Sequence, residues 1–204
     1  MTSLADQRTA LRVQLADVGS VEWTDAELND AINQALKDLS RVVPRERTAT
    51  IATTASSRDV TVTTGYEDLI RITAVELPTG NHPRTLRKFD FFAGILHFND
   101  DPVPDGSSLK LFYEAYHVIN GTASLPQMYD DVLLLGAAWK ACAARAAGTA
   151  NTVNTAGDLA PAAYAKAARA FRDEYGAAKP HPLKVRRMYA PSEPTATQDS
   201  DPGP

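Results

Sequence analysis

Two histidines and a group of carboxylates are the residues of this sequence best suited to chemistry. His97 and His117 fall in segments that we predict as strands, and Glu114 precedes the second of them by three positions. The acidic loop after His97 adds three carboxylates: Asp100, Asp101 and Asp105. Histidine with aspartate or glutamate can hold a metal ion or transfer protons.

The spacing of these residues argues against such a site. Glu114 and His117 have opposite parity, so on an ideal strand they point to opposite faces. The loop from Asn99 to Gly106 lacks the bidentate glutamate and the spacing of a calcium-binding hand. We therefore expect no metal ion, half-exposed histidines in a sheet, and a solvated turn. An enzyme with an unrecognised site around these three residues remains the least favoured hypothesis.

Other chemical signatures are missing from the sequence. It contains no GxSxG, GxxxxGK[ST], GxGxxG or HExxH pattern. Cys142 is the one cysteine and lies in an apolar helical segment, which predicts a buried, inert thiol and no disulfide. We expect no catalytic residues and no cofactor, and thus a protein that is not an enzyme.

Aromatic residues near Lys110 raise the question of nucleic-acid binding. Phe112, Tyr113 and Tyr116 could stack on bases, but the chain has a net charge of −4 and no RNA-recognition motif. Aromatic residues in the core of a sheet or at a subunit contact are the favoured interpretation.

Four segments have the periodicity of helices. The first covers about residues 3–17. In the second, Val21–Pro44, Thr24 and Glu27 form a capping box, and Leu28, Ile32 and Leu36 lie on one apolar face. A third helix follows Pro126 and is apolar nearly all round, which calls for partners on several sides. Asp158 is the predicted cap of the fourth.

Between these pairs the sequence is rich in β-branched residues and turn formers. It predicts about six short strands: 48–54, 59–63, 69–77, 85–89, 94–98 and 108–116. The fold class is therefore α+β, a four-helix bundle-like core with an inserted antiparallel sheet or sandwich. The expected units are 1–45 (helical hairpin), 46–120 (β insertion), 121–178 (second helical pair) and 179–204 (arm and disordered tail).

The arm combines basic and apolar residues that alternate after a proline-rich break, which is typical of an extended segment that docks on a partner. Its candidate docking residues are Lys179, Leu183, Lys184, Val185, Arg186, Arg187, Met188 and Tyr189. The N-terminus has no signal-peptide pattern, and no apolar stretch is long enough to cross a membrane, so we expect synthesis in the cytosol and no membrane partner.

Three stretches in this order resemble the phage head–tail connector (adaptor) family. They are Trp23–Leu28 with Ile32–Ala35, then Ser124–Ala138, and the alanine-rich fourth helix followed by the arm. Together they cover about half of the chain. The β insertion is larger than in the smallest all-helical connectors.

The resemblance implies a structural virion protein at the head–tail junction. Such proteins form homo-oligomeric rings, commonly of twelve copies, between the portal protein and a tail or head-closure protein, and genomic DNA passes through the lumen. The arm would dock on the portal, and the β insertion would face the tail or a neighbouring subunit. Five helical residues would pack between subunits: Leu28, Ile32, Leu36, Leu135 and Trp139. The alternative is a non-enzymatic module that binds carbohydrate or peptide through the β insertion.

Overall fold

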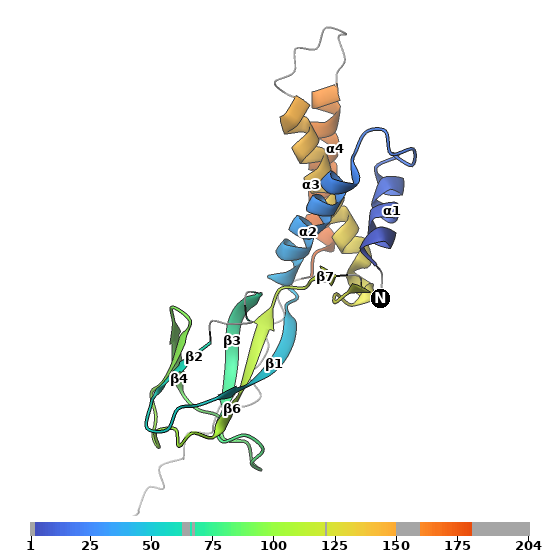
Figure 1. Cartoon of the computed structure of the whole chain (residues 1–204). Helices are drawn as coiled ribbons and strands as arrows, with labels where there is room; N and C mark the ends of the chain where they lie inside the picture. The colour runs from blue at the N-terminus through green and yellow to red at the C-terminus, as the bar shows by residue number, and fades with distance from the viewer. Residues whose placement is uncertain (1–2, 63–65, 67, 121, 150–159, 181–204) are drawn as a thin grey trace, which may run out of the picture.

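The computed structural model describes residues 3–62, 66, 68–120, 122–149 and 160–180. Helices gather at one end of an elongated molecule, and the strands between Arg45 and Ala115 lie at the other (Figure 1). The chain passes from the helices into the strands after Ser40 and returns after Ala115. The predicted α+β class with a β-rich insertion between two pairs of helices is confirmed.

The two N-terminal helices begin at capping boxes. Helix α1 (Leu4–Gln14) starts after Ser3, whose side chain is paired with Asp6, and α2 (Asp25–Ser40) starts after Thr24, paired with Glu27. In each box the hydroxyl accepts a backbone N–H and the carboxylate accepts the N–H of the cap residue. The box at Thr24 confirms the sequence prediction. Both helices are shorter than predicted because the chain turns at Leu15 and at Arg41.

Helix α3 (Asp130–Thr149) is the central element of the helical body, preceded by a 3₁₀ turn (Gln127–Tyr129). It packs against α1, α2 and α4 (Ala160–Ala178). Gly136 allows this close approach, since a Cβ there would lie 3.0 Å from the Tyr175 ring and 3.2 Å from the Ala35 Cβ. The partners that the apolar sides of this helix require are thus largely helices of the same chain. The predicted cap at Asp158 lies outside the described residues.

Six strands form two three-stranded antiparallel sheets. One has the order β1-β6-β3 and the other β2-β5-β4. Their bounds are β1 Arg45–Ala52, β2 Asp59–Thr61, β3 Leu69–Glu76, β4 Phe89–Phe92, β5 Ile95–Phe98 and β6 Ser108–Ala115. A small pair, β7 (Ile119–Asn120) and β8 (Thr122–Ala123), which sequence analysis missed, follows β6.

The segment predicted as a strand at 85–89 instead connects the two sheets. Leu86 forms a single bridge to Glu76 at the end of β3, and the Arg87 N–H donates to the Val75 carbonyl (2.9 Å). The Asn99 N–H then donates to the Lys88 carbonyl (3.1 Å), so the chain has already moved to the other sheet, where β4 begins. Because residues 86–88 bond to both sheets, the regular strand begins only at Phe89 and ends at Phe92.

Each end of the molecule has its own apolar core. The helical core centres on fully buried leucines of α1, α2 and α3, among them Leu11, Leu28 and Leu133. The β core lies between the two sheets, with Leu96 and Phe98 from one and Leu109, Leu111 and Val75 from the other. The two regions are therefore separately packed units joined by a narrow connection.

Candidate docking surfaces

The structure separates the histidines and carboxylates that sequence analysis grouped. His97 lies on the exposed face of β5, where its Nδ1 is 2.6 Å from Asp59 Oδ1. Glu114 is buried in β6 and accepts two hydrogen bonds of 2.7 Å from Arg71. Within the described residues, no three histidine, cysteine or acidic side chains come together as a metal site.

His117 is not the half-exposed sheet histidine that we expected. It lies just after β6, is buried, and ties the end of the β region to α2. Its backbone N–H donates to Ser40 Oγ (3.0 Å), and its ring Nε2 is 3.0 Å from the Val43 carbonyl. A carbonyl can only accept, so Nε2 carries the proton and Nδ1 faces the Ser124 hydroxyl (3.1 Å). Burial lowers the pKa of His117, which keeps the ring neutral.

The acidic loop after β5 is also not a simple solvated turn. Asp100 accepts from Arg87 Nε (2.8 Å) and from the Lys88 N–H (3.1 Å). Asp101 pairs with Arg58, which reaches the carbonyls of this loop as well. Asp100 and Asp101 therefore tie the loop to the segments before β4 and β2 by binding Arg87 and Arg58. Arg58 and Arg87 were the sequence signal that could have predicted these ion pairs.

Cys142 is buried in α3, as predicted for an inert thiol. Burial raises the pKa of its thiol to about 11, so the nucleophilic thiolate is scarce at neutral pH.

The aromatic residues of β6 alternate between faces. Tyr113 enters the β core, where it meets the edge of Tyr66, and Phe112 lies on the opposite face.

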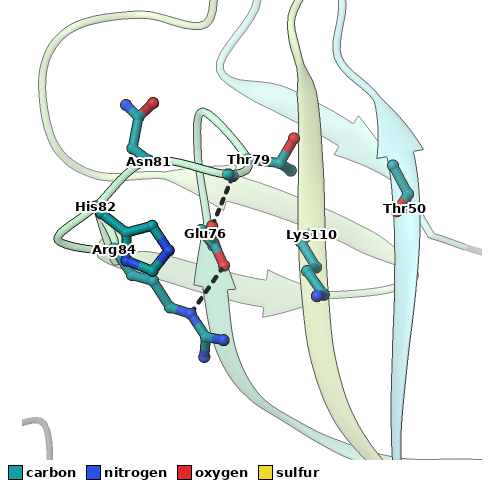
Figure 2. Close-up of a pocket in the computed structure, with 8 residues that line it drawn as sticks. Thr50, Glu76, Thr79, Asn81, His82, Arg84 and Lys110 are labelled. Carbon is teal, nitrogen blue, oxygen red and sulfur yellow. Dashed lines mark hydrogen bonds and ion pairs between the residues drawn. The ribbon is translucent and has the colours of Figure 1, made fainter.

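A polar hollow of about 360 Å³ opens on that opposite face of the β1-β6-β3 sheet. Thr50, Lys110 and Glu76 are paired across the three strands and form one row. The loop after β3 closes the hollow with Thr79, Gly80, Asn81, His82 and Arg84 (Figure 2). Sequence analysis missed this site because its residues are ordinary polar types with no shared spacing.

Charges in the hollow are partly paired. Glu76 is buried, accepts the Gly80 N–H (2.9 Å), and lies 3.8 Å from Arg84 Nε (Figure 2). Arg84 and Lys110 both lie over the Phe112 ring, at 5.7 and 5.5 Å from its centroid. Two cations and one carboxylate around an aromatic ring can bind a polar or anionic group. The site has no nucleophile paired with a base.

A second hollow, of about 400 Å³, lies between α2 and α3 in the helical body. Trp23 and small residues line it, with Glu27, Lys140 and Arg145 among its polar residues. Lys140 is already bound to Asp38 (2.8 Å).

The five residues predicted to pack between subunits fall into two groups. Leu28, Ile32 and Leu36 are at most 2% exposed and form part of the chain's own core, so in this conformation their side chains cannot reach a neighbour. Leu135 and Trp139 are half-buried. A single apolar stripe on α2 could not reveal whether its partner was α3 of the same chain or another copy.

Little of the predicted arm belongs to the described part of the chain. Lys179 follows α4, with its N–H donating to the Tyr175 carbonyl (2.8 Å) and its Nζ 5.4 Å from the centre of that ring. The other candidate docking residues, from Leu183 to Tyr189, lie outside the described residues. In the described part of the chain, no helix has the length and apolar character needed to cross a membrane.

Comparison with known proteins identifies the family. A family model described as SU10 adaptor protein matches residues 2–194. No curated protein matches the sequence. Among solved structures, a chain of "Neck of empty GTA particle computed with C6 symmetry" is similar, with 16% identity, a TM-score of 0.28, and coverage of 82% of this chain and 87% of that chain. Because the family match spans nearly the whole sequence, the chain belongs to the SU10 adaptor protein family, which confirms the resemblance to phage head–tail adaptors.

Proposed function

We propose that this adaptor forms a ring between the portal and the tail or a head-closure protein, and that genomic DNA passes through its lumen without sequence-specific contacts. The family match over residues 2–194 carries this proposal. Support comes from the elongated shape, with separately packed regions at the two ends (Figure 1). The role is structural, in the virion, after synthesis in the host cytoplasm. Twelve copies is the ring size that we propose.

Assembly with the portal tests this function directly. The full chain is mixed with purified portal rings, and the mass of the complex is measured by light scattering and by native mass spectrometry. We expect a complex with many adaptor copies per portal, twelve if the stoichiometry is right. A chain that stays monomeric both alone and with portal would contradict the function.

The arm is the proposed portal contact. Residues from Lys179 onward carry four cations interleaved with apolar side chains, a composition suited to an extended docking segment. Removal of residues 179–204 should abolish binding to portal rings and leave the circular dichroism spectrum of the helices and strands intact. Normal portal binding by this truncated chain would refute the arm hypothesis. A shorter truncation, 190–204, is the matched control and should bind normally.

Leu135 and Trp139 are the proposed lateral contacts. Both are half-buried on α3, and the Lys140 ammonium lies 4.3 Å from the centre of the Trp139 ring. A neighbouring copy would cover the remaining exposed area. Leu135→Ser should reduce the number of copies bound per portal, whereas Met128→Ser, at an exposed site, should not.

The hollow of Figure 2 favours a second candidate function, binding of carbohydrate or peptide by the β region. Its convergent polar groups and the Phe112 ring below them are the observation that supports it. Glycan and peptide arrays probed with the wild-type chain and with Lys110→Gln test it. Specific binding lost in the variant would support a ligand site, and an array without signal would dismiss it.

A further inference from the structure

The β4–β5 hairpin ends in an apolar tip that the rest of the chain leaves uncovered. Phe92 is 84% exposed, and its cross-strand partner Ile95 is 43% exposed. Phe91, on the other face of β4, is still 38% exposed. Single exposed apolar residues are common on protein surfaces, but Phe92 and Ile95 form an adjacent pair on one face of the hairpin, which favours an interaction surface.

The hairpin presents this tip in a fixed conformation. Only Ala93 and Gly94 connect the strands, with φ of 50° and 80°, the left-handed values of a two-residue type I′ turn. The Gly94 carbonyl accepts the Val62 N–H (2.7 Å), and the next two inward residues of β5, Leu96 and Phe98, are completely buried. A partner that binds Phe92 therefore does not have to order a mobile loop first, which favours affinity.

Two carboxylates and a histidine lie behind the tip. The strand register places Asp90, His97 and Asp59 in one row across β4, β5 and β2, on the same face as Phe92 and Ile95. Asp59 contacts His97, and Asp90 Oδ2 accepts from Asn99 Nδ2 (2.8 Å). Within the described residues, no lysine or arginine forms an ion pair with either carboxylate. The row thus offers two carboxylates to a cationic partner.

We propose that this face of the hairpin docks on a neck protein other than this chain, in an apolar pocket that takes the Phe92 ring and has lysine or arginine on its rim. The inference rests on the proposed function and assigns it a contact surface and a partner chemistry. The apolar residue supplies contact area, and the Asp90–Asp59 row supplies charge complementarity.

A second copy of this chain is the poorer occupant. The chain carries a net charge of −4. Its most exposed valines, Val13, Val18 and Val21, lie in α1 and the loop after it, at the opposite end of the molecule from the hairpin (Figure 1). Copies standing side by side in a ring would not bring these valines to the hairpin of a neighbour.

Site-specific photo-crosslinking tests the proposal in assembled necks. Phe92→p-benzoylphenylalanine is incorporated into the full chain, and Val21→p-benzoylphenylalanine, at a site that is 86% exposed, serves as the control. We expect irradiation to link position 92 to a neck protein of a different sequence. Links from position 92 to the adaptor itself, or no product from necks that contain the variant, would overturn the proposal. Wild-type chain missing from the necks would instead overturn the proposed function, and this inference with it.

Binding measurements test the chemistry of the contact. Burial of a phenylalanine side chain predicts that Phe92→Ser weakens attachment of the cross-linked protein about 10- to 100-fold. Asp90→Asn should weaken it less, and with a reduced dependence on salt. Val21→Ser should bind as the wild type does. All three sites are exposed, so unchanged circular dichroism is expected, and an unaltered affinity of Phe92→Ser would contradict the proposal.

Discussion

The helical body and the β region of this adaptor are stabilised in different ways. In the helical body, α3 is surrounded by other helices, and alanines and Gly136 bring the backbones close together. The β region has a smaller core between two three-stranded sheets, and arginine–carboxylate pairs such as Arg87–Asp100 hold its loops. One region is organised for close packing and the other for presenting short strands and loops.

Each region also has its own exposed surface features. Leu28 and Leu36 of α2, which the resemblance assigned to packing between subunits, are buried inside the helical body. Exposed apolar residues and a hollow occur in both regions. The helical body has Met128, Val21 and the hollow between α2 and α3, and the β region has Phe92 and the polar hollow. The proposed ring would use this division, with the helical body holding the copies together and the β region offering a distinct surface to another protein.

The largest effect should come from cavities in the two cores. Leu133→Ala in α3 and Leu96→Ala in β5 each remove a completely buried side chain, at an expected cost of about 2–5 kcal/mol. If the regions are separate units, each variant lowers the melting temperature of its own region. Both tryptophans, Trp23 and Trp139, lie in the helical body, so their fluorescence reports that region alone.

This pair of variants tests whether the two regions unfold independently. Equal shifts of tryptophan fluorescence in both variants would show one cooperative unit rather than two. Met128→Ala, at a site that is 76% exposed, should leave both transitions in place.

The close contact at Gly136 predicts the next largest effect. A methyl group in Gly136→Ala would meet a rigid tyrosine ring at 3.0 Å and another methyl at 3.2 Å, so we expect a loss of about 1–3 kcal/mol, seen in chemical denaturation. Gly176→Ala is the matched control, because nothing lies within 4 Å of its Cβ and alanine favours a helix by about 1 kcal/mol. A stable Gly136→Ala variant would mean that α3 and α4 are packed more loosely than described.

A smaller effect is expected from the cap of α2. Thr24→Ala leaves a backbone N–H without its hydroxyl partner and should cost about 0.5–2 kcal/mol in the helical body. The stability of the β region, followed by hydrogen exchange of the backbone N–H groups of β6, should not change. Thr24→Ser keeps the hydroxyl and should retain the stability of the wild type.

Local signals in the sequence predicted local structure well. The Thr24–Glu27 box, the strands predicted at 69–77 and 108–116, and the buried character of Cys142 all follow from short-range chemistry, and the structure confirms them. The order of helices and strands also supported the family, which the match over residues 2–194 confirms.

Partners distant in the sequence could not be predicted in the same way. The burial of His117 depends on Ser40 and Val43, more than seventy positions away. Likewise, the stripe of Leu28 and Ile32 specifies an apolar partner without saying which chain supplies it. Phe92 lay outside the predicted strand 85–89, so its place at the tip of a hairpin follows only from the observed register of β4 with β5.

His117 gives the smallest expected effect, a dependence of stability on pH at the junction of the two regions. Burial lowers the pKa of this histidine in the folded state from the ordinary value of 6.5. The unfolded chain therefore binds a proton more readily, so stability is fully present above pH 6.5 and decreases as the pH falls from there toward the folded pKa. Denaturation curves between pH 8 and 5 should show this decrease in the wild type, with a much shallower slope in His117→Gln. An unchanged slope in His117→Gln would place the titrating group elsewhere.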